Sequence, residues 1–392
     1  MYIFKIKNVA LSLICSMAIS ENSLWSVDKL IDLDNLDKEE STKKRSFTKE
    51  LDDESISKKI KKNSTFVAQE TAASTLSVLN WSIQLALPTL DKGNSPAAKS
   101  GLVSLLFQPN SQKLDAYPFS FDGIEAPVNK ALLTAGNLES VVSGYILYND
   151  EDPSGPTNYS AGHTKGFLFW NAEYVWWTIH SVPKWPSSLT PLSQINDEHR
   201  KYGQSLIITQ NPINNLEPIV HQLLVNTVNV YSSKIPESQK NGQWMSVLSK
   251  RSSVWSNFTQ TISIQPFSYG PSATSIPMMH FAKNKEWDKD LCNDLIGPTL
   301  GIKTISETWE KPLMRITALS NNILEIKSNV IADYPETYDH PKWAISKDPR
   351  NPWVFILDIN RMTSQFKRGG GGMGLNNLAL WKAFSSLIAK TD

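Results

Sequence analysis

Short apolar runs constrain the fold of this chain more than any other sequence feature. "KGFLFW" at 165–170, "YVWWTIH" at 174–180 and "WVFILDI" at 353–359 carry near-continuous apolar side chains. Such runs predict strands that are buried on both faces, so other elements must cover each side of a sheet. Further strands are predicted in "VLNWSIQLALP", where Trp81, Ile83, Leu85 and Leu87 alternate with other side chains, and at 143–150, 204–210, 322–328 and 342–345.

Helical spacing of apolar residues appears between these runs. It occurs in "EPIVHQLLVNTV" at 217–228, "DKDLCNDLI" at 288–296 and most clearly "NNLALWKAFSSLIAK" at 376–390. Because strands and helices are mixed throughout, the sequence predicts an α/β or α+β architecture.

The first 75 residues differ in composition from the rest. Residues 1–20 have Lys5 and Lys7 before an apolar stretch and small residues after it, which predicts a secretory signal peptide; a short buried helix is the alternative. Residues 21–75 are rich in charge and poor in large apolar groups, so a disordered leader is expected. Its basic clusters at 43–45 and 58–62 suit a solvated face, a nuclear address or a phosphate-binding arm. Folded structure is expected over 76–392.

Charge, cysteine content and missing motifs argue against several classes of protein. The chain has 392 residues, 39 basic and 38 acidic, so bulk positive charge cannot attract nucleic acid and any such binding needs a local patch. Cys15 would leave with the signal peptide, so Cys292 could form no internal disulfide. The absence of HExxH, CxxC and GxSxG patterns argues against zinc proteases, zinc fingers and α/β-hydrolases.

Two H-x-K patterns are the strongest candidates for chemistry. "GHTKGFLFW" holds His163 and Lys165, and "DHPKWAI" holds His340 and Lys342. On a strand, residues two apart project from the same face, so each pattern would present an imidazole beside an ammonium, a combination suited to phosphate. Roughly half an H-x-K or H-x-R is expected by chance from six histidines, so the surrounding sequence must decide.

That surrounding sequence resembles the deoxyribonuclease II family. The resemblance extends from about residue 79 to 384 and is carried by "LNWSIQLALP", "YILYND", "GHTKGFLFW", "WTIHSVP", "KYGQSLI", "FAKNKEWDKDL", "DHPKWAISKD", "DINRMTSQFKRGGGG" and "LALWKAF". It implies a phospholipase D-like pseudo-dimer, in which an N-terminal half (about 76–200) and a C-terminal half (about 201–392) each give one H-x-K to a shared active site.

The resemblance also implies a reaction that suits these residues. One neutral imidazole attacks phosphorus to form a phosphohistidine, and the other, protonated, donates to the leaving 5′ oxygen and later activates water. Lys165 and Lys342 hold the phosphate, so neither a metal nor a cofactor is expected. In the family this produces 3′-phosphate ends and, because one imidazole must be protonated, an acidic optimum. The sequence does not show which histidine attacks.

Other residues receive supporting assignments. The resemblance implies a supporting or phosphate-contacting role for His180 of "HSVP", and Asn360 is a candidate amide donor to phosphate. Asp348 lies one place late for the superfamily's carboxylate and is left out. "KRGGGGMG" at 367–374 predicts a turn near the phosphate or a flexible loop, and His199, His221 and His280 are interpreted as structural or surface residues.

The sequence thus predicts a secreted, metal-independent acid endodeoxyribonuclease with DNA as its partner, lysosomal in a eukaryote and extracellular or periplasmic in a bacterium. Two alternatives stay open. One is a phospholipase D-superfamily phosphodiesterase that acts on a different ester, and the other is a non-catalytic DNA-binding or toxin-like relative. The oligomeric state is not predicted.

Overall fold

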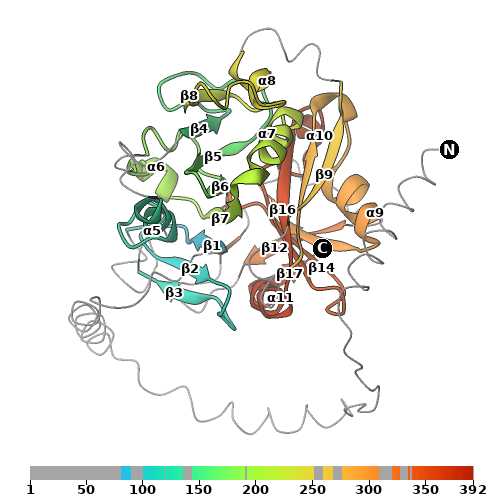
Figure 1. The fold of residues 1–392 in the computed structure, drawn as a ribbon. Helices are drawn as coiled ribbons and strands as arrows, with labels where there is room; N and C mark the ends of the chain where they lie inside the picture. The colour runs from blue at the N-terminus through green and yellow to red at the C-terminus, as the bar shows by residue number, and fades with distance from the viewer. Residues whose placement is uncertain are drawn as a thin grey trace, which may run out of the picture. The chain divides into compact units, whose positions relative to one another are not determined.

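A computed structural model describes residues 81–89, 100–118, 120–135, 144–189, 192–250, 259–267, 276–308, 320–326, 334–335 and 338–391. The predicted signal peptide, the charged leader and its basic clusters lie outside these residues. Among the described residues, the strands form two sheets, one of eight strands and one of nine (Figure 1). No helix in the described ranges is long and apolar enough to cross a membrane.

The first sheet has the strand order β3-β2-β1-β7-β6-β5-β4-β8, and all of its neighbours are antiparallel. Its strands are β1 (Trp81–Ala86), β2 (Ser104–Phe107), β3 (Asp115–Tyr117), β4 (Gly144–Asn149), β5 (Lys165–Trp170), β6 (Tyr174–His180), β7 (Gln204–Pro212) and β8 (Val230–Lys234).

The second sheet has the order β13-β12-β11-β14-β15-β16-β10-β9, with β17 paired to β12. Its neighbours are antiparallel apart from β11 and β12. Its strands are β9 (Ile262–Phe267), β10 (Met278–Lys283), β11 (Thr304–Glu307), β12 (Ser320–Ile326), β13 (Tyr334–Pro335), β14 (Trp343–Ser346), β15 (Trp353–Leu357), β16 (Gly370–Asn376) and β17 (Ile388–Thr391).

Helices connect and cover these strands. The α-helices are α5 (Pro127–Thr134), α6 (Asp197–Arg200), α7 (Leu216–Val225), α8 (Met245–Ser249), α9 (Gly297–Leu300), α10 (Thr363–Phe366) and α11 (Leu378–Ser385). Short 3-10 turns lie at η2 (Ile213–Asn215) and η3 (Lys285–Trp287), and η4 (Leu291–Ile296) is a π-helical segment.

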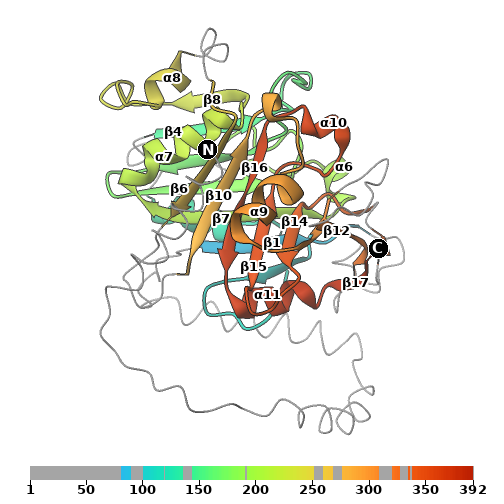
Figure 2. The same ribbon diagram turned by 90° about the vertical axis from the view of Figure 1, so that its right-hand side faces the viewer.

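The two sheets pack face to face, and Figure 2 shows β14, β15, β16 and β10 in front of strands of the first sheet. A central apolar cluster joins both sheets with α7 and α11, through residues such as Trp177, Met278 and Trp343. A second cluster packs α5 on the outer face of the first sheet, and a third, which includes the buried free thiol Cys292, packs η4 on the outer face of the second. The prediction of strands buried on both faces is therefore confirmed for β5, β14 and β15.

Three sequence expectations need correction. The halves were expected to meet near residue 200, but the chain passes from the first sheet to the second between Lys234 and Ile262, because β7 and β8 complete the first sheet. The helix expected to reach residue 390 ends at Ser385, since the chain from Ile388 pairs with β12.

The third correction concerns the glycine run at 369–374, which is not a loop. Gly370 begins β16, a buried strand hydrogen-bonded to both β10 and β15. Side chains of the neighbouring strands fill the space beside β16 that its own glycines leave open. A Cβ on Gly372 would lie 2.4 Å from Leu357 Cδ2, and one on Gly374 would lie 2.6 Å from Phe355 Cε1. A larger residue at either position would force the neighbouring side chain to move.

Candidate active site

The first H-x-K lies at the start of β5, with His163 just before the strand. The backbone N–H of His163 donates to the carbonyl of Gly369 at 2.8 Å, and its ring Nδ1 lies 2.8 Å from the carbonyl oxygen of Asp358. A carbonyl only accepts, so Nδ1 carries the proton and Nε2 keeps its lone pair when the ring is neutral. Both acceptors belong to the second sheet's half, so that half orients His163.

The second H-x-K lies just before β14 and is anchored in the opposite direction. The backbone N–H of His340 donates to the carbonyl of Gly203 at 3.0 Å, and Gly203 donates to the carbonyl of Tyr338 at 2.9 Å. The His340 ring stacks on Tyr202, with centroids 4.2 Å apart and planes 7° apart. Gly203 and Tyr202 immediately precede β7, so the first sheet's half orients His340.

Glycine is needed at both anchor points. A Cβ on Gly369 would lie 2.1 Å from the carbonyl oxygen of Asn226, and one on Gly203 would lie 1.7 Å from Asp339 Oδ1. These contacts are far below van der Waals distance. The two histidines were expected within strands, but each precedes its strand, because its backbone bonds the other half instead of a neighbouring strand.

Lys165 is 2% exposed and lies among carboxylates. Its Nζ forms an ion pair with Asp150, at the end of β4, and lies 3.2 Å from Glu151 Oε1. Arg368 Nη2 contacts the other oxygen of Asp150 at 2.9 Å. Burial disfavours the charged carboxylate, but Lys165, His163 and Arg368 outweigh it and hold the pKa of Asp150 well below its usual range. The ammonium of Lys165 is thus held in position by Asp150, which Arg368 holds in turn.

Lys342 is 4% exposed, and its Nζ donates to the carbonyl of His340 at 3.1 Å. Burial lowers the pKa of Lys342 to about 8, and Lys165 adds to the shift. Lys342 therefore remains charged at neutral and acidic pH. Two buried ammonium groups close enough to repel one another create a local positive field in a protein with almost no net charge.

Both imidazoles are neutral in the free site at neutral pH. Burial lowers the pKa of His163 to about 3; Asp150 opposes that shift, while Lys165 and Lys342 add to it. Burial also lowers the pKa of His340 to about 3, helped by Lys342, His199 and Lys165. An anion placed between the lysines would reverse part of these shifts.

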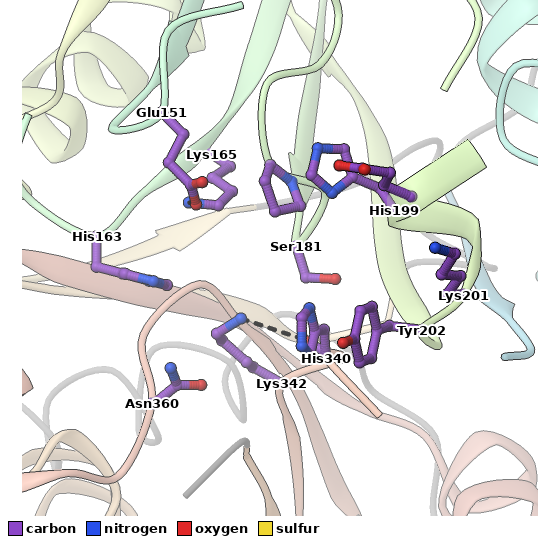
Figure 3. A pocket seen from close by; sticks show the side chains of 12 residues that line it. Glu151, His163, Lys165, Ser181, His199, Lys201, Tyr202, His340, Lys342 and Asn360 are labelled. Carbon is purple, nitrogen blue, oxygen red and sulfur yellow. Dashed lines mark hydrogen bonds and ion pairs between the residues drawn. The ribbon is translucent and has the colours of Figure 1, made fainter. Parts of the chain in front are cut away.

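All four H-x-K side chains line one cavity of about 420 Å³ (Figure 3). His163 and Lys165 approach it from the first half, and His340 and Lys342 from the second. Asn360 also lines it, and in the described part of the chain its Oδ1 has no hydrogen-bond partner. Ser181 lines the cavity as well, and its hydroxyl donates to Gln204 Oε1 at 2.6 Å. The site presents two neutral imidazoles and two ammonium groups to one space.

Comparisons with known proteins identify the family. Residues 75–392 match the family model described as Deoxyribonuclease II. The chain belongs to the deoxyribonuclease II family.

Named relatives span several lineages. "Deoxyribonuclease-2" of Caenorhabditis elegans is 33% identical over 264 residues, which are 65% of this chain and 68% of that protein. "Deoxyribonuclease-2-beta" of Mus musculus is 32% identical over 63% of this chain and 71% of its own length. "Plancitoxin-1" of Acanthaster planci is 27% identical over 80% and 89%, respectively.

Family membership identifies the chain as a deoxyribonuclease II-type nuclease, a hydrolase whose substrate is DNA. It favours this interpretation over a non-DNA phosphodiesterase or a non-catalytic relative. The mixed α/β architecture, with its two largely antiparallel sheets, is consistent with the phospholipase D-like fold of deoxyribonuclease II proteins.

His180, the family's "HSVP" histidine, lies behind the cavity wall. Its ring packs against Phe167 and Trp185, with centroids 6.0 and 4.9 Å away, and its Nδ1 accepts from the N–H of Val182 at 3.2 Å. Burial lowers its pKa well below the usual value, with Lys165 adding to the shift. A supporting role through Lys165 remains a prediction, and direct contact with the cavity is not seen.

The structure also places residues whose position the sequence did not reveal. Asp348 is paired with Arg350 at the surface, at 2.8 Å, and is not among the cavity residues. Asp150 supplies a carboxylate to Lys165 instead. His199, interpreted as structural or surface, lines the cavity with Lys201, whereas His221 contacts Gln260 and His280 contacts Gln222. No spacing in the sequence connects Asp150 or residues 198–202 to either H-x-K.

Proposed function

We propose that this deoxyribonuclease II-type protein is a metal-independent acid endodeoxyribonuclease that acts through a phosphohistidine. The observation that carries the proposal is that both H-x-K pairs line one cavity, although they are far apart in the sequence. Cleavage of a phosphodiester needs a nucleophile, a proton donor and positive charge around the nonbridging oxygens, and these four side chains supply all three.

His163 is the better nucleophile. Its Nδ1–H is held by the Asp358 carbonyl, so the Nε2 lone pair is available to attack phosphorus. Attack forms the N–P bond and breaks the bond between phosphorus and the 5′ oxygen. His340, in its protonated form, gives its proton to that oxygen, which leaves as a 5′-hydroxyl.

Hydrolysis of the intermediate restores the site. His340, now neutral, accepts a proton from water while the water oxygen attacks phosphorus and the N–P bond breaks. The product keeps a 3′-phosphate, His163 is again neutral and His340 is again protonated. Lys165 and Lys342 stabilise the nonbridging oxygens through both steps, and the amide of Asn360, which lines the same cavity, donates to one of them.

Metal independence is part of the proposal. Among the described residues, no group of three or more His, Cys, Asp or Glu side chains has the arrangement to hold a metal ion. Lys165 and Lys342 provide the charge that a metal ion provides in other phosphodiesterases. Export by the N-terminal segment is a second part of the proposal, supported by its sequence pattern alone.

The test is a plasmid-cleavage assay in EDTA across pH, followed by analysis of the product ends. We expect cleavage in EDTA with 3′-phosphate ends. His163→Ala and His340→Ala should each abolish turnover while DNA binding persists, and the double variant should be little worse than either one. Brief incubation with substrate at acidic pH, followed by a rapid alkaline quench in which the N–P bond survives, should trap phosphate on His163. A requirement for magnesium, 5′-phosphate ends, or activity in the double variant would refute the mechanism.

A further inference from the structure

The cavity contains a second group of side chains beyond the reacting residues. His199, Lys201 and Tyr202 line it together with Glu198, all from the short segment that includes α6. Figure 3 shows His199, Lys201 and Tyr202 on the side of His340, across the cavity from His163 and Lys165. The cavity therefore extends past His340, on the side away from His163 and Lys165.

This segment is held in place by bonds at both ends. At its start, Asn196 Oδ1 accepts the N–H of Glu198 at 2.9 Å, and Arg200 forms an ion pair with the buried Asp122. At its end, Gly203 is bonded in both directions to the chain around His340. The positions of His199 and Lys201 relative to His340 are consequently fixed by the fold.

The cavity is larger than one phosphodiester group needs. Its volume of about 420 Å³ lies within the range of cavities that hold ligands of several hundred daltons. A phosphate between Lys165 and Lys342 leaves most of that space for the groups attached to it. The space beyond His340 is lined by the ammonium of Lys201, which attracts a second anion, and by the imidazole of His199, which can donate a hydrogen bond to it.

We propose that His199 and Lys201 form a subsite for the next phosphate on the leaving strand, while Tyr202 holds the ring of His340. This inference rests on the proposed function, in which His340 protonates the leaving 5′ oxygen. The strand that departs carries its next phosphate on the same side of the cavity as residues 198–202. The substrate class is therefore a polynucleotide that extends at least one phosphate beyond the cleaved bond.

Substitution of Glu198 should have the opposite effect to substitution of Lys201. Its carboxylate lines the same wall as Lys201 and weakens the attraction for a second phosphate. Glu198→Gln should therefore strengthen the effect of that phosphate, whereas Lys201→Gln should weaken it. A change in folding alone would not produce opposite effects from two neutralising substitutions three residues apart.

The experiment uses a deoxytrinucleoside diphosphate without terminal phosphates. Cleavage at its first phosphodiester leaves the second phosphate on the departing strand, whereas cleavage at its second does not. The full-length protein should cleave the first bond in preference to the second. Lys201→Gln should reduce that ratio by about tenfold, the scale of one hydrogen bond to a charged group, and Glu198→Gln should increase it. Lys382→Gln, an exposed lysine on α11, is the matched control and should leave the ratio unchanged.

Binding separates this inference from the proposed function. With His163→Ala, the trinucleotide should bind more tightly than a dinucleoside monophosphate, and Lys201→Gln in that background should remove the difference. An unchanged product ratio, or equal loss for both nucleotides, would overturn the subsite. Lys201-dependent binding of the trinucleotide without any cleavage by the unsubstituted protein would instead refute the proposed function and leave the subsite intact.

Discussion

His163 and His340 share a residue type and a low pKa, yet the fold gives them different surroundings. His163 is fixed through Nδ1 by a backbone carbonyl, which sets its tautomer, whereas His340 is held by its own backbone and by a stacked tyrosine. The first arrangement suits a nucleophile that must present one nitrogen. The second keeps the ring plane fixed and suits a group that exchanges protons.

The pH dependence of turnover should reveal this division. The free site holds the pKa of His340 at about 3, so kcat/KM should fall as pH rises above that value, because the proton donor is lost. Bound phosphodiester adds a negative charge beside His340 and raises its pKa. The corresponding fall in kcat should therefore lie at higher pH, by about one unit or more. Steady-state kinetics at constant ionic strength measures both; coincident profiles would contradict the assignment.

At the level of elements, the approach to β16 connects the two halves of the site. Arg368 Nη2 contacts Asp150 and the carbonyls of Asn158 and Ala161, the turn that leads to His163, while the next residue, Gly369, accepts from the backbone of His163. A segment of the second half thereby positions both members of the first H-x-K. Arg368 acts through Asp150 and is a positioning residue.

Arg368→Ala should lower kcat by about tenfold or more with a smaller change in KM, because Lys165 loses its fixed carboxylate while the cavity remains. Arg368→Lys should recover part of the activity, and guanidinium ion added to the alanine variant should do the same. Arg350→Ala, which removes an exposed arginine paired with Asp348, is the charge control. Loss of kcat that neither lysine nor guanidinium restores would indicate a merely structural role.

At the level of the whole molecule, the sequence predicted those strands and helices whose apolar side chains recur at a regular spacing. The apolar runs located β5 at 165–170 and β6 at 174–180 with the bounds that the structure has. It did not predict β16, because a strand of glycines has no side chains from which a period can be read, and its partners provide the packing. In the same way the H-x-K pairs were visible as local patterns. Asp150 and Lys201 reach the site through tertiary structure alone.

The interface between the two sheets contains a titratable group with no part in the proposed chemistry. His280 on β10 is fully buried, its Nδ1 lies 3.1 Å from Gln222 Oε1 on α7, and its ring lies 4.7 Å from that of Trp177 on β6. Burial lowers the pKa of His280 to about 3. The folded state therefore opposes protonation that the unfolded chain accepts near pH 6.5.

This pKa shift lowers the free energy of unfolding at acidic pH, because His280 lies in the contact between the two sheets. A group whose pKa is lower in the folded state than in the unfolded state favours folding at pH values above its unfolded pKa. That contribution is lost as the pH falls from about 6.5 toward 3. At pH 4.5 the loss from His280 is on the order of 2–3 kcal/mol, since each pKa unit is worth about 1.4 kcal/mol.

His280→Gln should therefore be less stable than the unsubstituted protein at pH 7.5, through lost packing on Trp177. The difference should shrink or reverse at pH 4.5, because the variant has nothing to protonate there. Urea unfolding at the two pH values measures this, with His221→Gln as the control, since that ring is only partly buried at Gln260 and should change the difference less. A constant stability difference between pH 7.5 and 4.5 would show that His280 can be protonated without opening the contact between the sheets.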